Sequence, residues 1–466
     1  MSVSVAAIDL GASSGRVMVG DVGPRHLKLR AVARFANEAV RSSDGLHWDP
    51  LELYRRALLG LRTAVSLSHH GLRSVAVDSW AVDYALMRGD RMLGSPFHYR
   101  DERTITGVER IHAVIRPEEL YARNGLQFLS FNTLYQLAAD PLVDQADRML
   151  LIPDLVGYWL TGRSVTERTN ASTTGLLDVH TGTWDLALAE RLGLPRTLFT
   201  DLVSPGDVIG NVTPAVGEKV GDRALMVTAV GSHDTASAVV GVPMKGDDAA
   251  YISCGTWGLV GVELESPILT DEARRANFTN EGGVEGRIRF LTNVMGTWLL
   301  SETLRGWAST APLDQLLREA TNVTGQIPVF DVQDPRFLPP GDMPQRITSW
   351  FAENDKPAPQ DRATLVRSIV ESLAQAFADA IETAEKLSGQ TIGVVHLVGG
   401  GAQNELLCQA TANRSGRPVV AGPVEATALG SVLVQSRALG ELRGGLDEMR
   451  RLVADTHSLA RFEPRT

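Results

Sequence analysis

Two short turns rich in glycine and small polar residues carry the clearest chemical signal in this sequence. The first, Asp-Leu-Gly-Ala-Ser-Ser-Gly-Arg at 9–16, follows the apolar run Val3–Ile8. The second, Ser-Cys-Gly-Thr-Trp-Gly at 253–258, follows Ala249–Ile252. Glycine lets backbone N–H groups approach phosphate oxygens without a Cβ in the way, and Ser and Thr hydroxyls add donors. One such turn joins strands in many proteins, whereas a matched pair, one in each half of the chain, indicates two similar lobes that hold a nucleotide.

A carboxylate follows a further apolar strand, in the segment Gly-Ser-His-Asp-Thr at 231–235. The small apolar residues at 236–240 predict a helix directly after it. Asp234, at the mouth of a cleft and near a helix N-terminus, is suited to act as a base at neutral pH. The alternative is that Asp234 merely caps the helix, since Asp is a favoured N-cap residue. The local sequence leaves both interpretations open.

Three glycines, Gly399–Gly401, lie between a predicted strand and a predicted helix that begins at Asn404. Successive glycines let the backbone lie flat against a planar or anionic ligand, and Asn404 is a suitable helix cap. The spacing differs from GxGxxG, and no Lys-Ser or Lys-Thr pair follows, so the pattern argues against a dinucleotide fingerprint and against a P-loop. A tight strand-to-helix turn without a ligand is the alternative.

Polar and aromatic residues also follow the strands of the first half. They lie at 78–83 (Asp-Ser-Trp-Ala-Val-Asp) and at 98–101 (His-Tyr-Arg-Asp). Carbohydrate sites combine flat apolar rings with groups that hydrogen-bond to hydroxyls. We expect Trp80 to offer such a ring to a sugar, with burial in the core as the alternative. Asn293 has a matching place in the second half.

These residues must be positioned by strands that alternate with helices. Apolar runs and helical spacing in the first half predict this order of elements. The elements are three strands (Val3–Leu10, Arg16–Val22, Leu27–Phe35), a helix (Leu51–His69), a strand (Ser74–Val77), a turn-rich insertion (about 95–220) and a strand (Leu225–Val230).

The second half repeats this order of strands and helices. We expect the boundary between the halves at Pro243–Asp248, where Pro, Gly and charges cluster, and a surface excursion at Pro335–Pro359. The predicted strands are Ala249–Ser253, Gly258–Leu264, Arg287–Leu291, Gly393–Leu397 and Pro418–Val420, and the predicted helices are Val294–Trp307, Leu365–Leu387, Asn404–Arg414 and Ala426–Leu439.

Length and composition bound the class of protein. A chain of 466 residues exceeds what one hydrophobic core usually supports, so two or three domains are expected. The net charge of −10 argues against nucleic acid or an anionic membrane as a main partner. Cys254 and Cys408, far apart in the chain, predict neither a disulfide framework nor a metal cluster and fit a reducing cytoplasm. We find no secretory signal and no apolar run of bilayer length, so a cytoplasmic protein is expected.

Together these motifs resemble the FGGY carbohydrate kinases, which belong to the actin-like and hexokinase-like ATPases. The similarity runs from residue 3 to about 440. It rests on the two turns, on His-Asp-Thr at 233–235, on Asn-Val-Met-Gly-Thr-Trp at 293–298 and on Gly-Gly-Gly-Ala-Gln-Asn at 399–404. The turn at 9–16, Tyr-Arg-Asp at 99–101, the Phe-Leu and Phe-Asn-Thr-Leu-Tyr-Gln-Leu motifs within 128–137 and Ile-Pro-Asp-Leu at 152–155 are similar to family members that act on L-rhamnulose.

The resemblance implies an α/β fold of two actin-like, ribonuclease H-like ATPase domains that face each other across a cleft. Residues 1–243 would form an N-terminal domain with the sugar site, the first turn and the catalytic Asp. Residues 249–440 would form a C-terminal, ATP-binding domain, and 441–466 a C-terminal extension.

The resemblance also implies roles for single residues. The ATP phosphates would be held by Ala12, Ser13, Ser14, Gly15, Arg16 and Thr256, and Gly400 would lie near the adenosine. The sugar would be bound by His233, Asp234, Thr235 and Asn293, with Asp234 as the proton acceptor. Asp9 would hold Mg²⁺, through water.

Two positions depart from the family pattern. Ala81 stands where glycine usually lies beside the substrate, which would make the sugar pocket slightly tighter. Ser301 stands where a nucleotide-contacting Gln is usual, so this ATP contact would be shorter or lost. Neither departure affects the phosphate or base chemistry.

The implied activity is ATP-dependent phosphorylation of a ketose. L-rhamnulose, at its primary O1, is the first expectation, with L-fuculose and L-xylulose as alternatives. The implied partners are ATP, Mg²⁺ and the small ketose, on a monomer or homodimer. A non-catalytic actin-like nucleotide binder or a sugar sensor is the alternative from another class, and the presence of Asp9, Asp234 and both turns argues against it.

Overall fold

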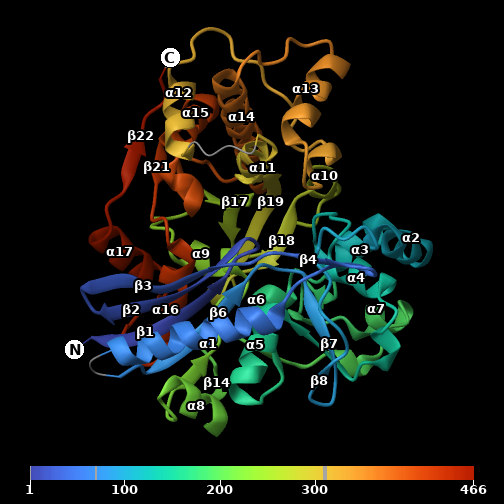
Figure 1. Cartoon of the computed structure of the whole chain (residues 1–466), viewed down its shortest axis with the longest axis vertical. Helices are drawn as coiled ribbons and strands as arrows, with labels where there is room; N and C mark the ends of the chain where they lie inside the picture. The colour runs from blue at the N-terminus through green and yellow to red at the C-terminus, as the bar shows by residue number, and fades with distance from the viewer. Residues whose placement is uncertain (1, 69–70, 308–311, 466) are drawn as a thin grey trace. The chain divides into compact units, whose positions relative to one another are not determined.

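The computed structural model describes residues 2–68, 71–307 and 312–465 as a mixed α/β protein (Figure 1). The chain folds into two compact units, each built from separate segments. No helix of these described residues is both long and apolar enough to cross a membrane. Unit 1 comprises Met1–Pro243, Glu263–Phe290 and Ala426–His457, and unit 2 comprises Met244–Val262, Leu291–Glu425 and Ser458–Thr466.

A six-stranded sheet forms the centre of unit 1, in the order β14-β15-β6-β1-β2-β3. β1 pairs antiparallel with β2 and parallel with β6, and β6 pairs parallel with β15. The bounds are β1 Val3–Leu10, β2 Ser14–Gly23, β3 His26–Ala36, β6 Ser74–Ser79, β14 Val208–Asn211 and β15 Met226–Thr228. β1 and β6 are apolar and buried on both faces, which explains their continuous hydrophobic runs.

Helices cover both faces of this sheet. α1 (Pro50–Leu67) packs against β2 at Gly60, where a Cβ would lie 2.6 Å from the Val17 side chain. α16 (Ala426–Ala438) packs against β2 at Gly20, where a Cβ would lie 2.7 Å from Val432. Val17 and Gly20 are three positions apart on one strand and therefore point to opposite faces. The other helices of unit 1 outside the insertion are α9 (Asp234–Val240), α10 (Asp271–Arg275) and α17 (Leu446–Thr456).

The insertion at 95–220 contains several short helices, which share a hydrophobic core with strand residues just before the insertion. Buried side chains from its helices and from two short strands form this core, among them Tyr84, Ile111, Leu134 and Leu151. Its helices are α2 Thr104–Val114, α3 Pro117–Asn124, α4 Thr133–Ala139, α5 Ile152–Thr161, α6 Arg168–Ala171, α7 Leu186–Arg191 and α8 Pro214–Val220. The short strands in and before it are β4 Val40–Ser42, β5 Gly45–His47, β7 Tyr84–Arg88, β8 Arg91–Met92, β9 Arg148–Leu151, β10 Val165–Glu167, β11 Leu177–Asp178, β12 Thr183–Trp184 and β13 Asp201–Val203.

Unit 2 repeats the arrangement of unit 1. Its sheet has the order β19-β17-β16-β20-β21-β22, with β16 antiparallel to β17 and parallel to β20. The long helix α14 packs against α15 and α12, and Gly258 on β17 leaves room for the Phe377 ring of α14. The strands are β16 Ala249–Cys254, β17 Trp257–Leu264, β19 Ile288–Met295, β20 Val394–Val398, β21 Val419–Ala421 and β22 Ala460–Phe462, and β18 (Thr279–Gly282) lies in the segment counted with unit 1. The helices are α11 Trp298–Gly306, α12 Leu313–Thr321, α13 Met343–Glu353, α14 Arg362–Ser388 and α15 Glu405–Ser415.

Most of the predicted strands and helices are confirmed, to within a few residues at their ends. The first helix begins at Pro50, and its N-cap Asp49 accepts from Glu52 N at 3.0 Å. His69, the predicted end of this helix, lies outside the described residues. In unit 2, Asn404 caps α15 as predicted, because its side chain accepts from Leu407 N at 3.1 Å.

Two predictions in unit 2 are wrong. The helix predicted from Val294 begins only at Trp298, because β19 continues to Met295 and Gly296 N then donates to Thr256 O at 3.2 Å. The stretch predicted as a surface excursion contains α13, whose second residue is Pro344, a position that tolerates proline. Several large side chains of this stretch are buried and not on the surface: Phe337, Met343, Ile347, Trp350 and Phe351.

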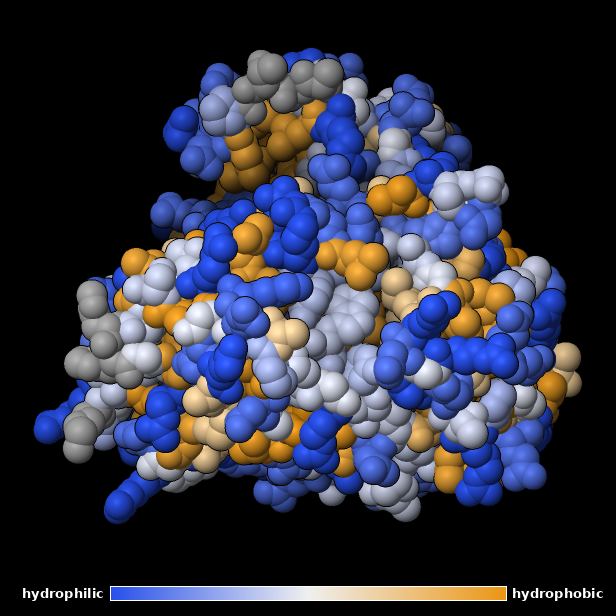
Figure 2. All heavy atoms as spheres, turned by 60° about the horizontal axis from the view of Figure 1, so that its bottom comes forward, coloured by the Kyte–Doolittle hydropathy of each residue, from blue (hydrophilic) through white to orange (hydrophobic). Residues whose placement is uncertain are grey.

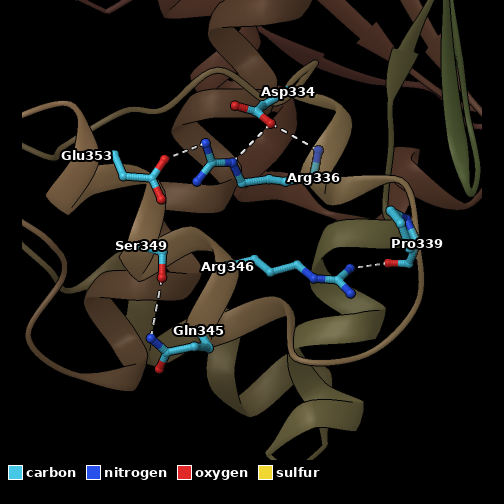
Figure 3. Close-up of a pocket in the computed structure, with 7 residues that line it drawn as sticks. All are labelled: Asp334, Arg336, Pro339, Gln345, Arg346, Ser349 and Glu353. Atoms are coloured by element: carbon cyan, nitrogen blue, oxygen red, sulfur yellow. Dashed lines mark hydrogen bonds and ion pairs between the residues drawn. The ribbon is translucent and has the colours of Figure 1, made fainter.

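A surface pocket of about 480 Å³ lies beside α13 (Figure 3). Arg336 bridges Asp334 and Glu353, at 3.0 and 2.7 Å, and Arg346 donates to the carbonyl of Pro339. Both guanidinium groups are therefore engaged by the protein itself. We assign no ligand to this pocket.

The outward side of α1 mixes leucines with charged residues. Leu51, Leu59 and Leu67 are exposed, while Glu52 forms ion pairs with Arg55 and Arg56 at 2.6 and 2.7 Å. The face of the molecule in Figure 2 likewise shows hydrophilic side chains interspersed with hydrophobic ones. Scattered exposed leucines of this kind are normal for a protein surface.

Candidate functional site

Two carboxylates lie side by side at one end of the unit 1 sheet. Asp9 on β1 and Asp78 on β6 are register partners of the parallel pair, so their side chains share a face. Asp9 is held by Arg16, the residue opposite it on β2: Nε and Nη2 approach Asp9 Oδ2 at 2.8 and 2.7 Å. Asp78 is fully buried, and neither of its carboxylate oxygens has a hydrogen-bond partner among the described residues.

Burial raises the pKa of Asp78 well above its usual value, and the negative charges of Asp9 and Asp234 raise it further. Arg16 and the Ser431 hydroxyl act in the opposite direction. These influences bring Asp234, predicted as the base, into the same electrostatic neighbourhood as the two strand-end carboxylates. The sheet of unit 1 thus gathers three acidic residues that are far apart in the sequence.

Asp234 is presented by a loop that crosses the end of β6. Ser79 N donates to Ser232 O at 2.9 Å, and Ser79 and His233 form a parallel bridge. The N-cap of α9 is His233, Asp234 is the first helical residue, and neither makes a side-chain cap bond. The interpretation of Asp234 as a helix cap is therefore wrong. Its carboxylate is 32% exposed, accepts from the Thr235 hydroxyl at 3.1 Å and lies 3.3 Å from His233 Nε2.

His233 is fixed by a buried ion pair that the sequence did not reveal. Arg289 and Glu281 lie 3.1 Å apart, and the Arg289 Nη2 donates to His233 Nδ1 at 3.1 Å. Although burial alone would raise it, the charge of Arg289 and the neighbouring His233 imidazole lower the pKa of Glu281. Because a guanidinium has no acceptor, Nδ1 accepts in this pair, and a neutral His233 carries its proton on Nε2, 3.3 Å from Asp234 Oδ1. A signal for this pair was present, since Arg289 interrupts an apolar strand and a buried charge needs a partner.

The same loop is anchored from the insertion by Glu167. Its Oε2 accepts from both Ser232 N and Ser232 Oγ at 2.9 Å, and its Oε1 accepts from Thr169 N at 2.8 Å. Glu167 also caps α6, and it is buried, which raises the pKa of its carboxyl. The contact spans 65 residues of sequence. A single sequence gives no sign of such a long-range anchor.

The first glycine turn connects β1 and β2. Gly11 N donates to Ser14 O at 2.9 Å, and Asn37 clamps the turn from behind, with its Nδ2 on Gly11 O at 2.9 Å and its N on Ser13 O at 3.1 Å. Ser13 and Ser14 are exposed, whereas Gly15 is buried. A Cβ at Gly15 would lie 2.2 Å from the Phe35 ring. Packing against Phe35 therefore already requires a glycine at position 15.

The second glycine turn, in unit 2, is braced by the start of α11. Thr297 N and Oγ1 donate to Gly255 O at 2.9 and 2.8 Å. Gly296 makes this contact possible, because a Cβ there would lie 2.5 Å from the carbonyl carbon of Trp257. Gly255 is exposed with no atom near its Cβ position, and Thr256 is half-buried beside it.

The remaining predicted residues of unit 2 differ in their exposure. Gly400 is exposed and has open space at its Cβ position, while Gly401 packs against Cys254, with 2.4 Å from its Cβ position to Sγ. Ser301 is exposed on α11. Asn293 is half-buried on β19, and its carbonyl accepts from Gln333 Nε2 at 3.0 Å. Gly400 is thus the glycine of this loop that is free of packing demands.

Trp80 belongs to a buried aromatic group. It is 6% exposed, its ring lies 4.2 Å from that of Trp48, and its Nε1 donates to Asp83 at 2.9 Å. This burial favours the core interpretation of Trp80 over a ring offered to a sugar. Ala81, the next residue, is half-buried.

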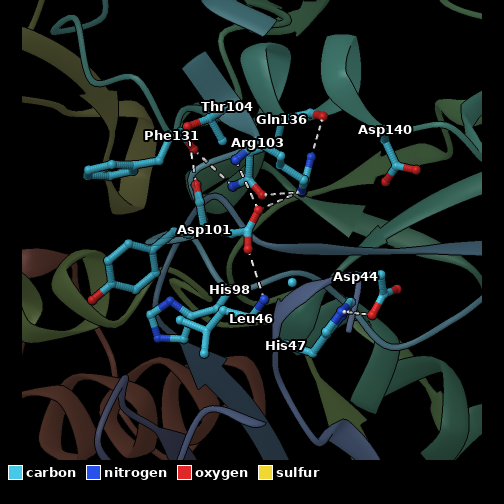
Figure 4. A network of polar contacts seen from close by, with 12 residues as sticks. Asp44, Leu46, His47, His98, Asp101, Arg103, Thr104, Phe131, Gln136 and Asp140 are labelled. Carbon is cyan, nitrogen blue, oxygen red and sulfur yellow. Dashed lines mark hydrogen bonds and ion pairs between the residues drawn. The ribbon is translucent and has the colours of Figure 1, made fainter. Parts of the chain in front are cut away.

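Asp83 is the centre of a polar network behind Trp80. It accepts from the indoles of Trp48 and Trp80 and from Gln136 Nε2, at 2.6, 2.9 and 2.8 Å, and burial raises the pKa of its carboxyl to about 6. Figure 4 shows Arg103 next in this network, with Nη1 and Nη2 donating to Gln136 O and Oε1 at 2.7 and 3.0 Å. The neighbouring Val82 has φ 68°, an unfavourable conformation for a β-branched residue. The network therefore holds residues 80–83 in one strained arrangement.

Comparison with known proteins decides the family. Residues 4–241 match the N-terminal domain of the FGGY family of carbohydrate kinases, and residues 250–439 match its C-terminal domain. This chain belongs to the FGGY family. It is a carbohydrate kinase, an enzyme that acts on ATP and a sugar.

Curated relatives of this FGGY kinase align with it over nearly their whole length. The chain is 38% identical to the rhamnulokinase of Bacteroides thetaiotaomicron, covering 100% of this chain and 96% of that one. It is 40% identical to the rhamnulokinase of Pectobacterium atrosepticum, covering 99% and 93%, and 38% identical to that of Bacillus subtilis, covering 98% and 95%.

Solved structures confirm the fold. The crystal structure of gluconate kinase from Lactobacillus acidophilus matches with a TM-score of 0.80 at 15% identity, covering 100% of this chain and 94% of that one. Glycerol kinase from Plasmodium falciparum with ADP matches with a TM-score of 0.79 at 14% identity, covering 100% and 94%. The predicted α/β, actin-like kinase fold with two domains is therefore correct.

An ATP-dependent kinase family implies a divalent cation. Within the described ranges, no group of three or more His, Cys, Asp and Glu side chains is arranged to hold a metal by itself. The residues present fit a cation that is shared with phosphates, because Mg²⁺ in kinases is usually bound by one or two carboxylates together with the nucleotide. Asp9 and Asp78, at the end of the unit 1 sheet, offer carboxylates of this kind.

Proposed function

We propose that this FGGY kinase transfers the γ-phosphoryl group of ATP to O1 of L-rhamnulose. The observation that supports this substrate most directly is the similarity at 38–40% identity, along nearly the full length, to rhamnulokinases from several bacteria. L-fuculose and L-xylulose, which are ketoses of similar size, are the competing substrates.

In unit 1 we assign the chemistry to Asp234. Its carboxylate is accessible, makes no cap bond to α9 and is held beside His233, whose own position is fixed by Arg289. Asp234 would orient the O1 hydroxyl and accept its proton as the phosphoryl group transfers. Phosphoryl transfer passes through a loose transition state, so this positioning, more than nucleophile activation, is the main contribution.

We assign sugar recognition to the residues that the family resemblance suggests. His233 would donate from Nε2 to a sugar hydroxyl, and Thr235 would bind next to it. Ala81 would line the pocket on the rigid segment 80–83, and Asn293 of unit 2 is the further sugar ligand. Our proposal keeps the sugar site within residues 1–243 and ATP binding within 249–440, although the segments 263–290 and 426–457 fold with unit 1.

ATP would be held by the two glycine turns. In the first turn, Ala12–Gly15 would donate backbone N–H groups and the exposed hydroxyls of Ser13 and Ser14, and Arg16 would add its guanidinium. In unit 2, the half-buried Thr256 would bind phosphate, Gly400 would lie against the adenosine, and Ser301 would make a short contact or none. Open space at the Cβ position of Gly400 is compatible with a ligand there.

The divalent cation would be Mg²⁺, with Asp9 as the carboxylate that holds it through water. When bound to the nucleotide, Mg²⁺ neutralises charge on the β- and γ-phosphates. Asp9 is kept in place by Arg16. We further propose that the enzyme is cytoplasmic, since ATP is supplied in the cytoplasm. We propose a monomer or a homodimer.

A ketose panel tests this assignment. Turnover and KM would be measured for L-rhamnulose, L-fuculose and L-xylulose in a coupled assay with ATP and Mg²⁺. L-rhamnulose is expected to give the highest kcat/KM, because a misplaced hydroxyl leaves pocket groups unpaired. A higher kcat/KM for L-fuculose or L-xylulose would make this chain a kinase of that ketose. If none of the three ketoses supports ATP turnover, all three are excluded as substrates of this kinase.

A further inference from the structure

Asp78 is a buried carboxylate for which the fold gives no use. It lies at the end of β6, has an exposed fraction of 0%, and neither oxygen has a hydrogen-bond partner among the described residues. Burying a carboxylate without donors is costly. A residue kept at such a cost calls for a reason outside the packing of unit 1.

Other buried carboxylates of unit 1 show what a structural role looks like. Asp83 accepts from two indoles, an amide and a backbone N–H, and Glu167 caps a helix while it anchors Ser232. Each of these groups is satisfied by several donors, as is usual for buried polar atoms. Asp78 is the contrast, since its oxygens are buried and meet no comparable set of donors.

The surroundings of Asp78 are acidic. Asp9 is its register partner on β1, and Asp234 lies close enough for its charge to act on Asp78. The positive group acting on it is the guanidinium of Arg16, which is already bonded to Asp9, and the neutral hydroxyl near it is that of Ser431. A cation near Asp9 would relieve the repulsion among these carboxylates.

We propose that Asp78 is a second carboxylate, beside Asp9, that binds the divalent cation accompanying ATP, directly or through a water. This inference rests on the proposed function, because the cation arrives with the nucleotide. Two carboxylates that complete their coordination with phosphate oxygens and water form the kind of site that Mg²⁺ favours. It assigns to Asp78 a role in nucleotide binding that the family resemblance did not suggest.

ADP binding with and without metal tests the role without using the sugar. Calorimetry would give the Kd of ADP in EDTA and in Mg²⁺ for the wild type, for Asp78→Asn and for the control Asp140→Asn. Asp140 is also a buried carboxylate of unit 1, but it is satisfied by Tyr84 and Leu142 N. In Asp78→Asn the metal-dependent gain in ADP affinity is expected to fall roughly 10- to 100-fold, as for the loss of a metal-site carboxylate or its outer-shell partner. The affinity in EDTA is expected to stay equal or to rise, because the proposed contact between Asp78 and the nucleotide is made through the metal.

A cysteine variant provides a second and independent reading. In Asp78→Cys, Mg²⁺ is expected to strengthen ADP binding poorly and Cd²⁺ to restore it, because thiolates prefer soft metals. Asp140→Cys should respond to the two metals as the wild type does. Thermal melting of Asp78→Asn without metal is expected at or above the wild-type temperature, since an unpartnered buried carboxylate has been removed.

Each outcome decides the inference. A metal-dependent gain that stays within about twofold of wild type in Asp78→Asn would overturn it, as would melting well below the wild type, which would mark Asp78 as a structural residue. Wild-type protein that binds no ADP would overturn the proposed function and this inference with it. Wild-type binding that fails to depend on metal would leave the kinase assignment standing and remove the role of Asp78.

Discussion

Glu167 offers the sharpest test of how the catalytic loop is held. Replacing it by Gln keeps the volume but exchanges one acceptor oxygen for an NH₂ group. The amide oxygen can replace Oε2, which faces Ser232, only if the NH₂ then faces Thr169 N, which donates to Oε1 at 2.8 Å. Either orientation leaves at least one buried donor without an acceptor, at a cost of about 1–3 kcal/mol.

This cost predicts a kinetic effect of known size. If the loop carrying His233 and Asp234 leaves its productive arrangement by that energy, kcat/KM for the ketose falls roughly 5- to 150-fold. The Kd for ATP should change little, because Glu167 bonds to Ser232 and Thr169 and to neither glycine turn. The readouts are steady-state kinetics in the coupled assay, ATP calorimetry and thermal melting.

Asp185→Asn is the matched control. Asp185 is likewise a buried N-cap carboxylate in the insertion, and it accepts from Arg123 Nε and Nη2 at 2.7 Å each. The Asp185→Asn variant is expected to have a lower melting temperature than the wild type and a kcat/KM close to that of the wild type. Glu167→Gln with reduced melting temperature and unchanged kcat/KM would refute the claim that Glu167 positions the loop for catalysis.

Three further changes test separate parts of the structure. Asp234→Asn should lower kcat about 10²- to 10⁴-fold with melting and ATP affinity near wild type, because Asp234 makes no cap bond; near-normal turnover would exclude it as the base. Gly15→Ala should destabilise by about 1–3 kcal/mol through its clash with Phe35, whereas Gly400→Ala should melt normally and weaken only nucleotide binding; equal melting of both variants would contradict the packing explanation. The wild type should lose about 2 kcal/mol of stability relative to Asp83→Asn as the pH rises from 4 to 6, since burial lifts the pKa of Asp83 to about 6 and the folded state then holds the proton more tightly than the unfolded one. Melting of both proteins from pH 4.5 to 7.5 checks this last point, and a constant difference between them would contradict it.

The strands of both units were predictable because each is a buried apolar run that ends in small or acidic residues. Val3–Leu10 and Ala249–Cys254 agree with their predicted ranges to within one residue. The position of Asp9 and of the loop that carries Asp234 at one end of the unit 1 sheet was predictable for the same reason, since strand ends present side chains at one edge of a sheet. The start of α13 was missed because Pro344 suggested a loop, although proline fits the first turn of a helix.

The supporting residues of the site were not predictable from one sequence. The partner of Glu167 is Ser232, which lies 65 residues away along the chain. Glu281 and Arg289 contact His233, which lies 48 and 56 residues away from them. Asn37 likewise holds the first turn from 26 residues away. The sequence left the choice between a core position and a sugar contact for Trp80 open, because only the fold shows that the Trp48 ring lies 4.2 Å from it. Local patterns identify the groups that do chemistry, while long-range contacts decide which of them are free to do it.

The central claim is that the γ-phosphoryl group of ATP is transferred to O1 of L-rhamnulose, with Asp234 as the base. The most direct measurement is NMR of the product formed from L-rhamnulose labelled with ¹³C at C1, in the presence of ATP and Mg²⁺. We predict a phosphorus–carbon coupling at C1 in the wild type, with product formation strongly slowed in Asp234→Asn. Release of inorganic phosphate without a sugar phosphate, or a phosphate on another carbon, would contradict the account.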